Sequence, residues 1–222
     1  MSTLGEVIEG VAADVAACHD ELNRLDAAAG DGDLGNTVVL AAQAVRAAVE
    51  ASPDAEPAAL LRQCGTDVAT RAPSTTGTLT ARALLAAARA VGGEAAADSG
   101  ASRSAVPVVH AAFAAALTAI KAAGKAAAGD KTMIDALEPA VAALSAAADA
   151  GSALPEALSA AAAAARHGAE LTRDMTPQAG RARWLAERSQ GSEDAGARLV
   201  ALVLESAAAR LQAGRASQYP TG

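Results

Sequence analysis

The sequence predicts an all-α protein, built as a bundle or closed ring of eight antiparallel helices. Hydrophobic residues make up 52% of the 222 residues but aromatic residues only 1%, so the core must consist of Ala, Val and Leu. Alanine has the highest helix propensity and little bulk, which favours helices that pack at short distances. No stretch has the length and alternation of a convincing strand, and no motif repeats at a fixed period. A bias in genomic composition would also enrich alanine, so the composition indicates helix and not function.

The first helix is predicted over residues 4–28, which carry the clearest helical stripe. Its apolar positions follow one another at steps of three or four residues, which places them on one face. These positions are Val7, Val11, Val15, Cys18, Leu22 and Leu25.

Seven further helices are predicted, each separated from the next by residues that break helices. They span residues 36–50, 57–71, 77–91, 104–122, 132–149, 153–173 and 194–213. Pro107 lies close enough to a helix start to be tolerated, whereas Pro139 is expected to kink or interrupt its helix. The mostly short connections imply antiparallel neighbours. No connection resembles a long linker, so residues 1–222 are predicted to form a single domain.

Charge and cysteine content exclude several classes of protein. The formal net charge is −7, with 25 acidic and 18 basic residues, and neither a basic face nor stacking aromatics are visible. Nucleic acid is therefore not an expected partner. Cys18 and Cys64 are expected to be small buried residues of helices and not a disulfide framework. The start of the chain lacks the pattern of a signal peptide, and no apolar run approaches the ~18 residues of a membrane span. No membrane association is expected, and the predicted location is cytoplasmic.

The stretch LDAAAGDGDLGNT, residues 25–37, places three aspartates beside glycines where the first helix must end. A short turn could fold Asp31 and Asp33 back towards Asp26. Hard divalent cations prefer oxygen ligands, and three carboxylates this close repel one another unless a cation or solvent compensates them. The stretch therefore indicates a metal site, with a solvated acidic turn of helix-capping aspartates as the alternative.

Two later turns contain residues that suit a bound anion. In RAPSTTGTLTAR, hydroxyl residues precede Gly77 at the opening of a helix, where free N–H groups favour an anion. In GKAAAGDKTMIDAL, Gly124 and Gly129 bracket a turn, and Asp130 or Thr132 can cap the next helix. Ordinary helix caps explain both turns equally well.

The 175–193 segment concentrates arginines in an otherwise acidic protein. Arg181, Arg183 and Arg188 lie there beside the single tryptophan, Trp184. The guanidinium fork suits phosphate oxygens, and a mobile loop with such residues could close over a nucleotide. Pairing with acidic surface residues is the alternative.

The order of the helices predicts that these four connections meet. In an antiparallel ring, alternate connections emerge at the same end. The 30–35, 73–77 and 123–131 turns follow the first, third and fifth predicted helices, and the 175–193 segment follows the seventh. We therefore expect one composite site for a metal and phosphate at one rim.

The motifs resemble, in the same order, those of the nucleotide-binding L subunit of dihydroxyacetone kinases, the DhaL-type family. The matching stretches are LDAAAGDGDLGNT, the GTL after the hydroxyl-rich turn, GDKTMIDALEPA and GRARWLAERSQGSEDAGA. The resemblance runs from near residue 20 to about residue 200. It implies a closed barrel of eight antiparallel helices, with a nucleotide and Mg²⁺ at one rim.

The resemblance also implies roles for individual residues. Asp26, Asp31 and Asp33 would be the Mg²⁺ ligands and, with Arg181, the catalytic residues. The nucleotide, ATP or ADP, would be bound by Leu34, Gly35, Asn36, Thr37, Thr75, Thr76, Gly124, Met133, Arg181, Asp194, Ala195 and Gly196.

The function implied by the resemblance is phosphoryl transfer to dihydroxyacetone or a related short-chain ketose. A separate K-type subunit would hold the ketose, because His19, His110 and His167 lie in no matching motif. The donor is either exchangeable ATP or a tightly held ADP that a phosphotransferase-system protein rephosphorylates. A regulatory or interaction module without transfer activity is the alternative. It is motivated by Leu34 in place of the family's histidine and by PSTTG in place of GGxSG; DAG also replaces DPG, and Trp184 replaces a tyrosine.

Overall fold

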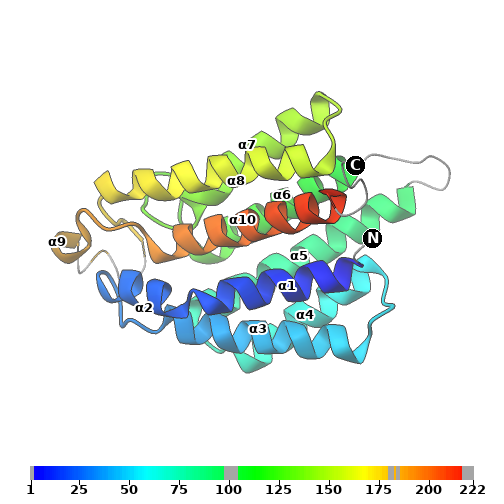
Figure 1. The fold of residues 1–222 in the computed structure, drawn as a ribbon. Helices are drawn as coiled ribbons and strands as arrows, with labels where there is room; N and C mark the ends of the chain where they lie inside the picture. The colour runs from blue at the N-terminus through cyan, green and yellow to red at the C-terminus, as the bar shows by residue number, and fades with distance from the viewer. Residues whose placement is uncertain (1–2, 98–104, 180–182, 184–185, 217–222) are drawn as a thin grey trace.

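The computed structural model describes residues 3–97, 105–179, 183 and 186–216, and these residues form helices without any strand (Figure 1). The predicted all-α class is confirmed. The helices are α1 (Leu4–Ala17), α2 (His19–Ala27), α3 (Leu34–Ala51), α4 (Pro57–Arg71), α5 (Thr75–Ala97), α6 (Ala105–Gly124), α7 (Ile134–Asp149), α8 (Leu154–Leu171), the 3₁₀ turn η1 (Thr172–Asp174), α9 (Ala186–Ser189) and α10 (Ala195–Ala216).

The long helices form a closed antiparallel ring. Helices α3 to α8 each pack against the next along the chain, and α10 closes the ring by contacting α8 on one side and α1 on the other. Figure 1 shows α8, α10, α1 and α3 side by side with alternating direction. The predicted closed barrel is therefore confirmed.

The first predicted helix is in fact two helices. The chain breaks at Cys18, whose φ and ψ of −90° and 15° end α1 before α2 begins. The apolar stripe continues through the break, which is why the sequence pattern did not show it. The break lets α2 pack closely across the first turn of α3, where Gly35 approaches the carbonyl of His19.

Pro139 does not interrupt its helix, so the expected interruption is wrong, whereas the alternative, a kink, stays a prediction. Helix α7 runs from Ile134 to Asp149 with Pro139 inside it. Proline has no N–H to bond the carbonyl four residues earlier, which here belongs to Asp135. That carbonyl faces α8 so closely that a Cβ on Gly168 would lie 2.2 Å from it. The missing hydrogen bond thus falls where α7 and α8 lie close together.

The core is built from small aliphatic side chains, as predicted. One buried cluster joins α6, α7, α8 and α10 through Val106, Leu144, Leu158 and Leu204 with many alanines. A second joins α3, α4 and α5 and includes the buried thiol of Cys64. Cys18 is half-buried, and both cysteines are free.

Helix α6 is the one described helix that is long and apolar enough to cross a membrane. It has 20 residues, and the mean hydropathy of its best window is 1.6. The expectation that no stretch would approach this length is wrong, because the helix contains a single Lys or Arg, Lys121, near its end. In the barrel α6 packs between α5 and α7, and 22% of this window is buried.

Candidate functional site

Four connections meet at one end of the barrel, beside α2 and α9 in Figure 1. They are the 28–33, 72–74 and 125–133 turns and the segment between α8 and α10. Hydrogen bonds link them: Thr37 Oγ1 to Ser74 Oγ (3.1 Å), Gln178 N to Asp130 O (3.1 Å) and Arg188 Nη2 to Ala27 O (3.2 Å). The predicted convergence on one rim is confirmed.

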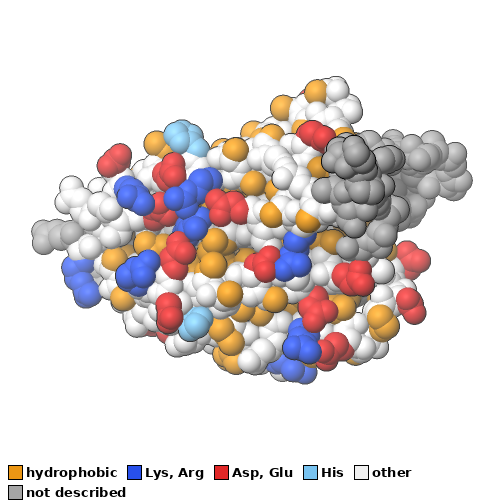
Figure 2. Space-filling view, viewed as in Figure 1, with side chains coloured by type: hydrophobic (Ala, Val, Ile, Leu, Met, Phe, Trp, Pro, Cys, Tyr) orange, Lys and Arg blue, Asp and Glu red, His pale blue; other side chains and the backbone are white. Residues whose placement is uncertain are grey.

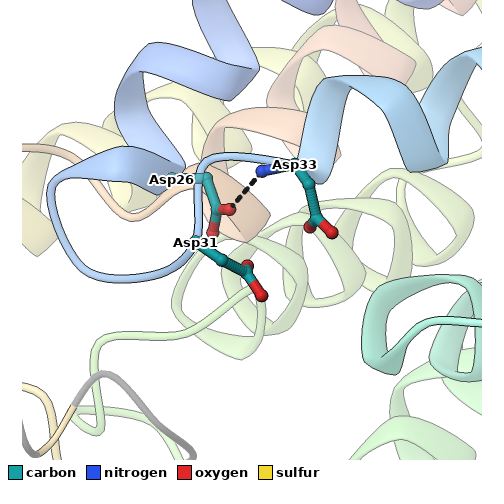
Figure 3. Close-up of side chains that lie close together, drawn as sticks. All are labelled: Asp26, Asp31 and Asp33. Carbon is teal, nitrogen blue, oxygen red and sulfur yellow. Dashed lines mark hydrogen bonds between the residues drawn. The ribbon is translucent and has the colours of Figure 1, made fainter.

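The aspartate turn is folded by one of its own carboxylates. Asp26 lies in the last turn of α2, and its Oδ2 accepts hydrogen bonds from Gly32 N (2.8 Å) and Asp33 N (3.0 Å). Gly32 has a φ of 79°, a conformation that glycine adopts at little cost. The chain therefore returns on itself and brings Asp31 and Asp33 to Asp26 (Figure 3).

The three carboxylates are placed to share a cation. One oxygen from each of Asp26, Asp31 and Asp33 lies within 4.8 Å of the other two. Asp33 occupies the N-cap position of α3 without a capping hydrogen bond from its side chain, so helix capping does not explain this carboxylate. Carboxylate oxygens are the ligands that Mg²⁺ and Ca²⁺ prefer, so the trio is a candidate site for a hard cation.

The first turn of α3 mixes packing residues with residues that face solvent. The Leu34 side chain is only 4% exposed and packs in a core cluster with Val15 and Leu199. The Gly35 N–H is already bonded to Asn23 Oδ1 (2.7 Å). The Leu34 side chain and the Gly35 N–H are thus engaged within the protein, whereas the Asn36 side chain is exposed, with its Oδ1 accepting a hydrogen bond from Asn23 Nδ2 (3.4 Å).

The hydroxyl-rich turn caps α5, which begins two residues earlier than predicted. Ser74 Oγ accepts from Gly77 N (3.0 Å) and from the buried Thr37 hydroxyl (3.1 Å). Thr75 is exposed and Thr76 half-buried in the first turn of the helix. The turn thus contains an ordinary cap, and the hydroxyls of Thr75 and Thr76 flank it.

Asp135, which the sequence analysis did not single out, organises the loop between α6 and α7. Its carboxylate is 7% exposed and accepts hydrogen bonds from Gly129 N and from Thr132 N (2.7 Å). The spacing of Thr132 and Asp135 is that of a helix-start pair, a signal visible in the sequence. Asp130, expected as a possible helix cap, instead accepts from Ala127 N within the loop (2.7 Å).

The start of α10 lies against the start of α7. A Cβ on Gly196 would lie 3.3 Å from Met133 Cβ and 3.1 Å from Asp194 Oδ1. The neighbouring Ala195 is 6% exposed and belongs to the core, while Gly124, at the end of α6, is exposed. The structure therefore brings Met133, Asp194 and Gly196 together and leaves Gly124 at the edge.

Arg181 and Trp184 lie outside the described residues. The other two arginines of the segment, Arg183 and Arg188, are exposed. The guanidinium of Arg188 bonds the carbonyl of Ala27, the residue next to Asp26. One of the predicted arginines therefore contacts the backbone of the aspartate turn.

The sequence matches the DAK2 domain family over residues 28–209, most of the barrel and all four rim connections. This chain belongs to the DAK2 domain family. Its motifs and fold are those of the DhaL-type subunit of dihydroxyacetone kinases, as the resemblance implied.

Curated relatives of this DAK2 domain include several kinases. It is 36% identical over 201 residues to the D-erythrulose kinase of Mycolicibacterium smegmatis, covering 90% of this chain and 33% of the relative. It is 34% identical over 199 residues to the human triokinase/FMN cyclase, covering 89% of this chain and 33% of the relative. The chain thus spans about a third of the length of these relatives.

The solved dihydroxyacetone kinase of C. freundii has the same fold. Its complex with AMP-PNP and Mg²⁺ aligns with a TM-score of 0.71 at 28% identity, over 95% of this chain and 34% of that one. The native form aligns with a TM-score of 0.70 at 30% identity, over 93% and 34%.

Asp194 of this DAK2 domain has an unusual acidity. Its Oδ1 accepts a hydrogen bond from Ala197 N (2.7 Å), which favours the charged form. Burial opposes this effect and, with the nearby charges of Asp135 and Asp26, raises the pKa of Asp194 to about 7. The side chain thus gains a proton near neutral pH in the folded state.

We expect acidification to stabilise the unliganded domain through Asp194. Its pKa is raised in the folded state, so between about pH 4 and 7 the folded protein binds a proton that the unfolded chain releases. Each pKa unit corresponds to about 1.4 kcal/mol, which gives a gain of a few kcal/mol at most. Asp194→Asn keeps the cap acceptor and should remove this gain from thermal unfolding curves recorded at pH 8, 6.5 and 5. An unchanged pH dependence in the variant would contradict the assignment.

Proposed function

We propose that this DAK2 domain is the nucleotide- and Mg²⁺-binding phosphoryl-transfer subunit of a dihydroxyacetone kinase or a related short-chain ketose kinase. The observation that carries the proposal is the turn in which Asp26 draws Asp31 and Asp33 together at the rim. The kinase names of its relatives and the AMP-PNP and Mg²⁺ of the C. freundii complex support it.

The residues at the rim fit these ligands. Asp26, Asp31 and Asp33 would hold Mg²⁺, since carboxylate oxygens are the ligands that a hard cation prefers and one oxygen of each lies near those of the other two. The bound ion would neutralise negative charge on phosphate oxygens during transfer. Asn36, Thr75 and Thr76 are polar groups at the starts of α3 and α5, where helix N-termini favour phosphate.

The rest of the nucleotide would lie beside the starts of α7 and α10. Met133 and Gly196 are in contact there and offer an apolar surface without a side chain on the glycine. Asp194 is the polar group of this region. Arg181 is proposed as the catalytic arginine of the 175–193 segment, on the strength of the motif alone.

The acceptor ketose would be held by a separate K-type subunit. The domain corresponds to only a third of its kinase relatives, which leaves two thirds of their length for other tasks. The phosphoryl donor is ATP or a phosphotransferase-system protein that acts through bound ADP. ADP that stays with the purified domain and does not exchange with ATP would favour the second donor.

The decisive experiment supplies the domain with a K-type protein and a panel of three- and four-carbon ketoses. We expect phosphorylation that requires Mg²⁺, a donor and both proteins. The assay is repeated with a phosphotransferase-system donor mixture. No phosphorylation under either condition, together with no thermal stabilisation by Mg²⁺ and ADP, would contradict the proposal.

A non-catalytic regulatory or interaction module is the second candidate. The observation in its favour is Leu34, which stands where the family has a histidine and turns its side chain into the core. The polar group of the family is thereby removed from the rim. The Asp31 variant described in the Discussion separates the two functions.

A further inference from the structure

Lys131 is a lysine buried at the rim, only 3% exposed. Its Nζ donates a hydrogen bond to the carbonyl oxygen of Ser189 at 2.7 Å, across 58 residues of sequence. Burial lowers the pKa of Lys131, and the carboxylates of Asp194 and Asp174 oppose this effect. Burying an ammonium is costly unless it is well bonded, so this contact compensates a real penalty.

The backbone at Lys131 has an unusual conformation. Its φ of 57° lies in the left-handed region, which side chains other than glycine rarely adopt. Asp135 fixes the loop on both sides of the lysine by accepting from Gly129 N and Thr132 N. Hydrogen bonds to one carboxylate therefore flank the lysine in the chain.

The partner of Lys131 belongs to the segment next to the aspartate turn. Ser189 ends the short helix α9 and is 1% exposed. The preceding residue, Arg188, bonds the carbonyl of Ala27 (3.2 Å), and the following turn is closed by Ser192 N to Ser189 O (3.1 Å). A continuous path of contacts thus runs from the loop before α7 through α9 to the residue adjacent to Asp26.

We propose that Lys131 is a positioning residue that fixes α9 against the aspartate turn and so sets the affinity of the site for the nucleotide. The inference rests on the proposed function for its ligand. The hydrogen bond from Lys131 Nζ to the Ser189 carbonyl, called the tether below, is a property of the unliganded protein. In this proposal the lysine of the GDKTM stretch acts by holding the neighbouring segment in place and does not contact the reacting phosphate.

Hydrogen exchange in the unliganded protein tests the tether. Lys131→Met removes the ammonium and keeps an unbranched side chain, and Lys125→Met is the matched control, because Lys125 is exposed in the same loop and also has a positive φ (49°). We expect the amides of Gly191 and Ser192 to exchange about 10-fold faster in Lys131→Met, with the amides of α8 unchanged. Lys125→Met should exchange like the wild type. Equal exchange in all three proteins would overturn the tether.

Nucleotide binding tests the consequence. In titrations with ADP and Mg²⁺, Lys131→Met should bind about 10-fold more weakly than wild type, and Lys125→Met should bind equally well. With a K-type protein present, the KM for the nucleotide should rise while kcat changes less than about threefold, as for a loss of uniform binding. A loosened segment with unchanged affinity would overturn the positioning role.

A second variant at Lys131 distinguishes the loss of this hydrogen bond from a general loss of structure. Lys131→Arg keeps a cationic donor for the Ser189 carbonyl and should protect Gly191 and Ser192 better than Lys131→Met; equal loss in both would overturn the inference. If the wild type itself fails to bind ADP with Mg²⁺, the proposed function fails, while the exchange experiment still decides the tether.

Discussion

Replacing Asp31 with asparagine is expected to lower phosphoryl transfer at least about 100-fold, since a metal contributes several kcal/mol to stabilising the transferred charge. The Asp31 carboxylate is exposed and lies with those of Asp26 and Asp33 within 4.8 Å. Asparagine keeps the size of the side chain and one hydrogen-bonding oxygen at an exposed position, so the stability of the unliganded barrel should change by less than about 1 kcal/mol. Activity is measured with a K-type protein and stability by thermal unfolding without ligand.

The same variant should lose stabilisation by the ligand. For the wild type, ADP and Mg²⁺ at 100 times the dissociation constant add about 2.7 kcal/mol, which raises the Tm by about 5–11 °C. Asp54→Asn is the control, because Asp54 is an exposed aspartate in the connection between α3 and α4, away from the trio. An Asp31 variant that transfers phosphate as well as the wild type would reject the catalytic role and favour the regulatory module.

Replacing Gly35 with alanine is expected to destabilise the barrel by about 3 kcal/mol or more, the upper range for overpacked cores. A Cβ at this position would lie 2.1 Å from the carbonyl oxygen of His19 and 2.8 Å from Asn23 Oδ1. The carbonyl belongs to the backbone of α2, so relief requires moving α2 away from α3. We expect a Tm lower by about 6–12 °C in thermal unfolding of the unliganded protein.

Gly93→Ala provides the matched control for a helical glycine. Gly93 lies in α5 with no atom within 4 Å of an added Cβ. Alanine should therefore stabilise α5 by up to about 1 kcal/mol. A Gly35→Ala protein as stable as the wild type would show that α2 and α3 are not held at this distance.

Most helices could be predicted because their signals are local. The alanine-rich stretches and the breakers between them predicted the seven later helices to within about three residues at each end, except that α5 continues through Gly92 and Gly93 to Ala97, beyond its predicted end at residue 91. The breaks that were missed or misjudged depend on neighbours in space. Cys18 ends a helix where α2 packs across α3, and Pro139 is tolerated where the carbonyl it leaves unbonded meets Gly168.

Part of the candidate site could be predicted from the sequence and part could not, because some of its residues are neighbours in the chain and others only in space. Asp26, Asp31 and Asp33 are close in sequence, so their spacing alone predicted the trio. Leu34 and Gly35 fell within the same motif, yet whether each faces the rim or the core depends on the angle between α2 and α3. Lys131 is an ordinary charged residue in a loop until α9 covers it.

The sequence by itself determined that this chain is helical, where its turns fall and which turn gathers carboxylates, because helix propensity, chain breakers and short-range spacing act within a few residues. Only the tertiary structure decided which rim groups are already committed to hydrogen bonds within the protein: the Gly35 N–H to Asn23, the Thr37 hydroxyl to Ser74 and the Lys131 ammonium to Ser189. Such commitments are made by groups far apart in the chain or by the burial of a side chain, and burial exists only once the helices have packed.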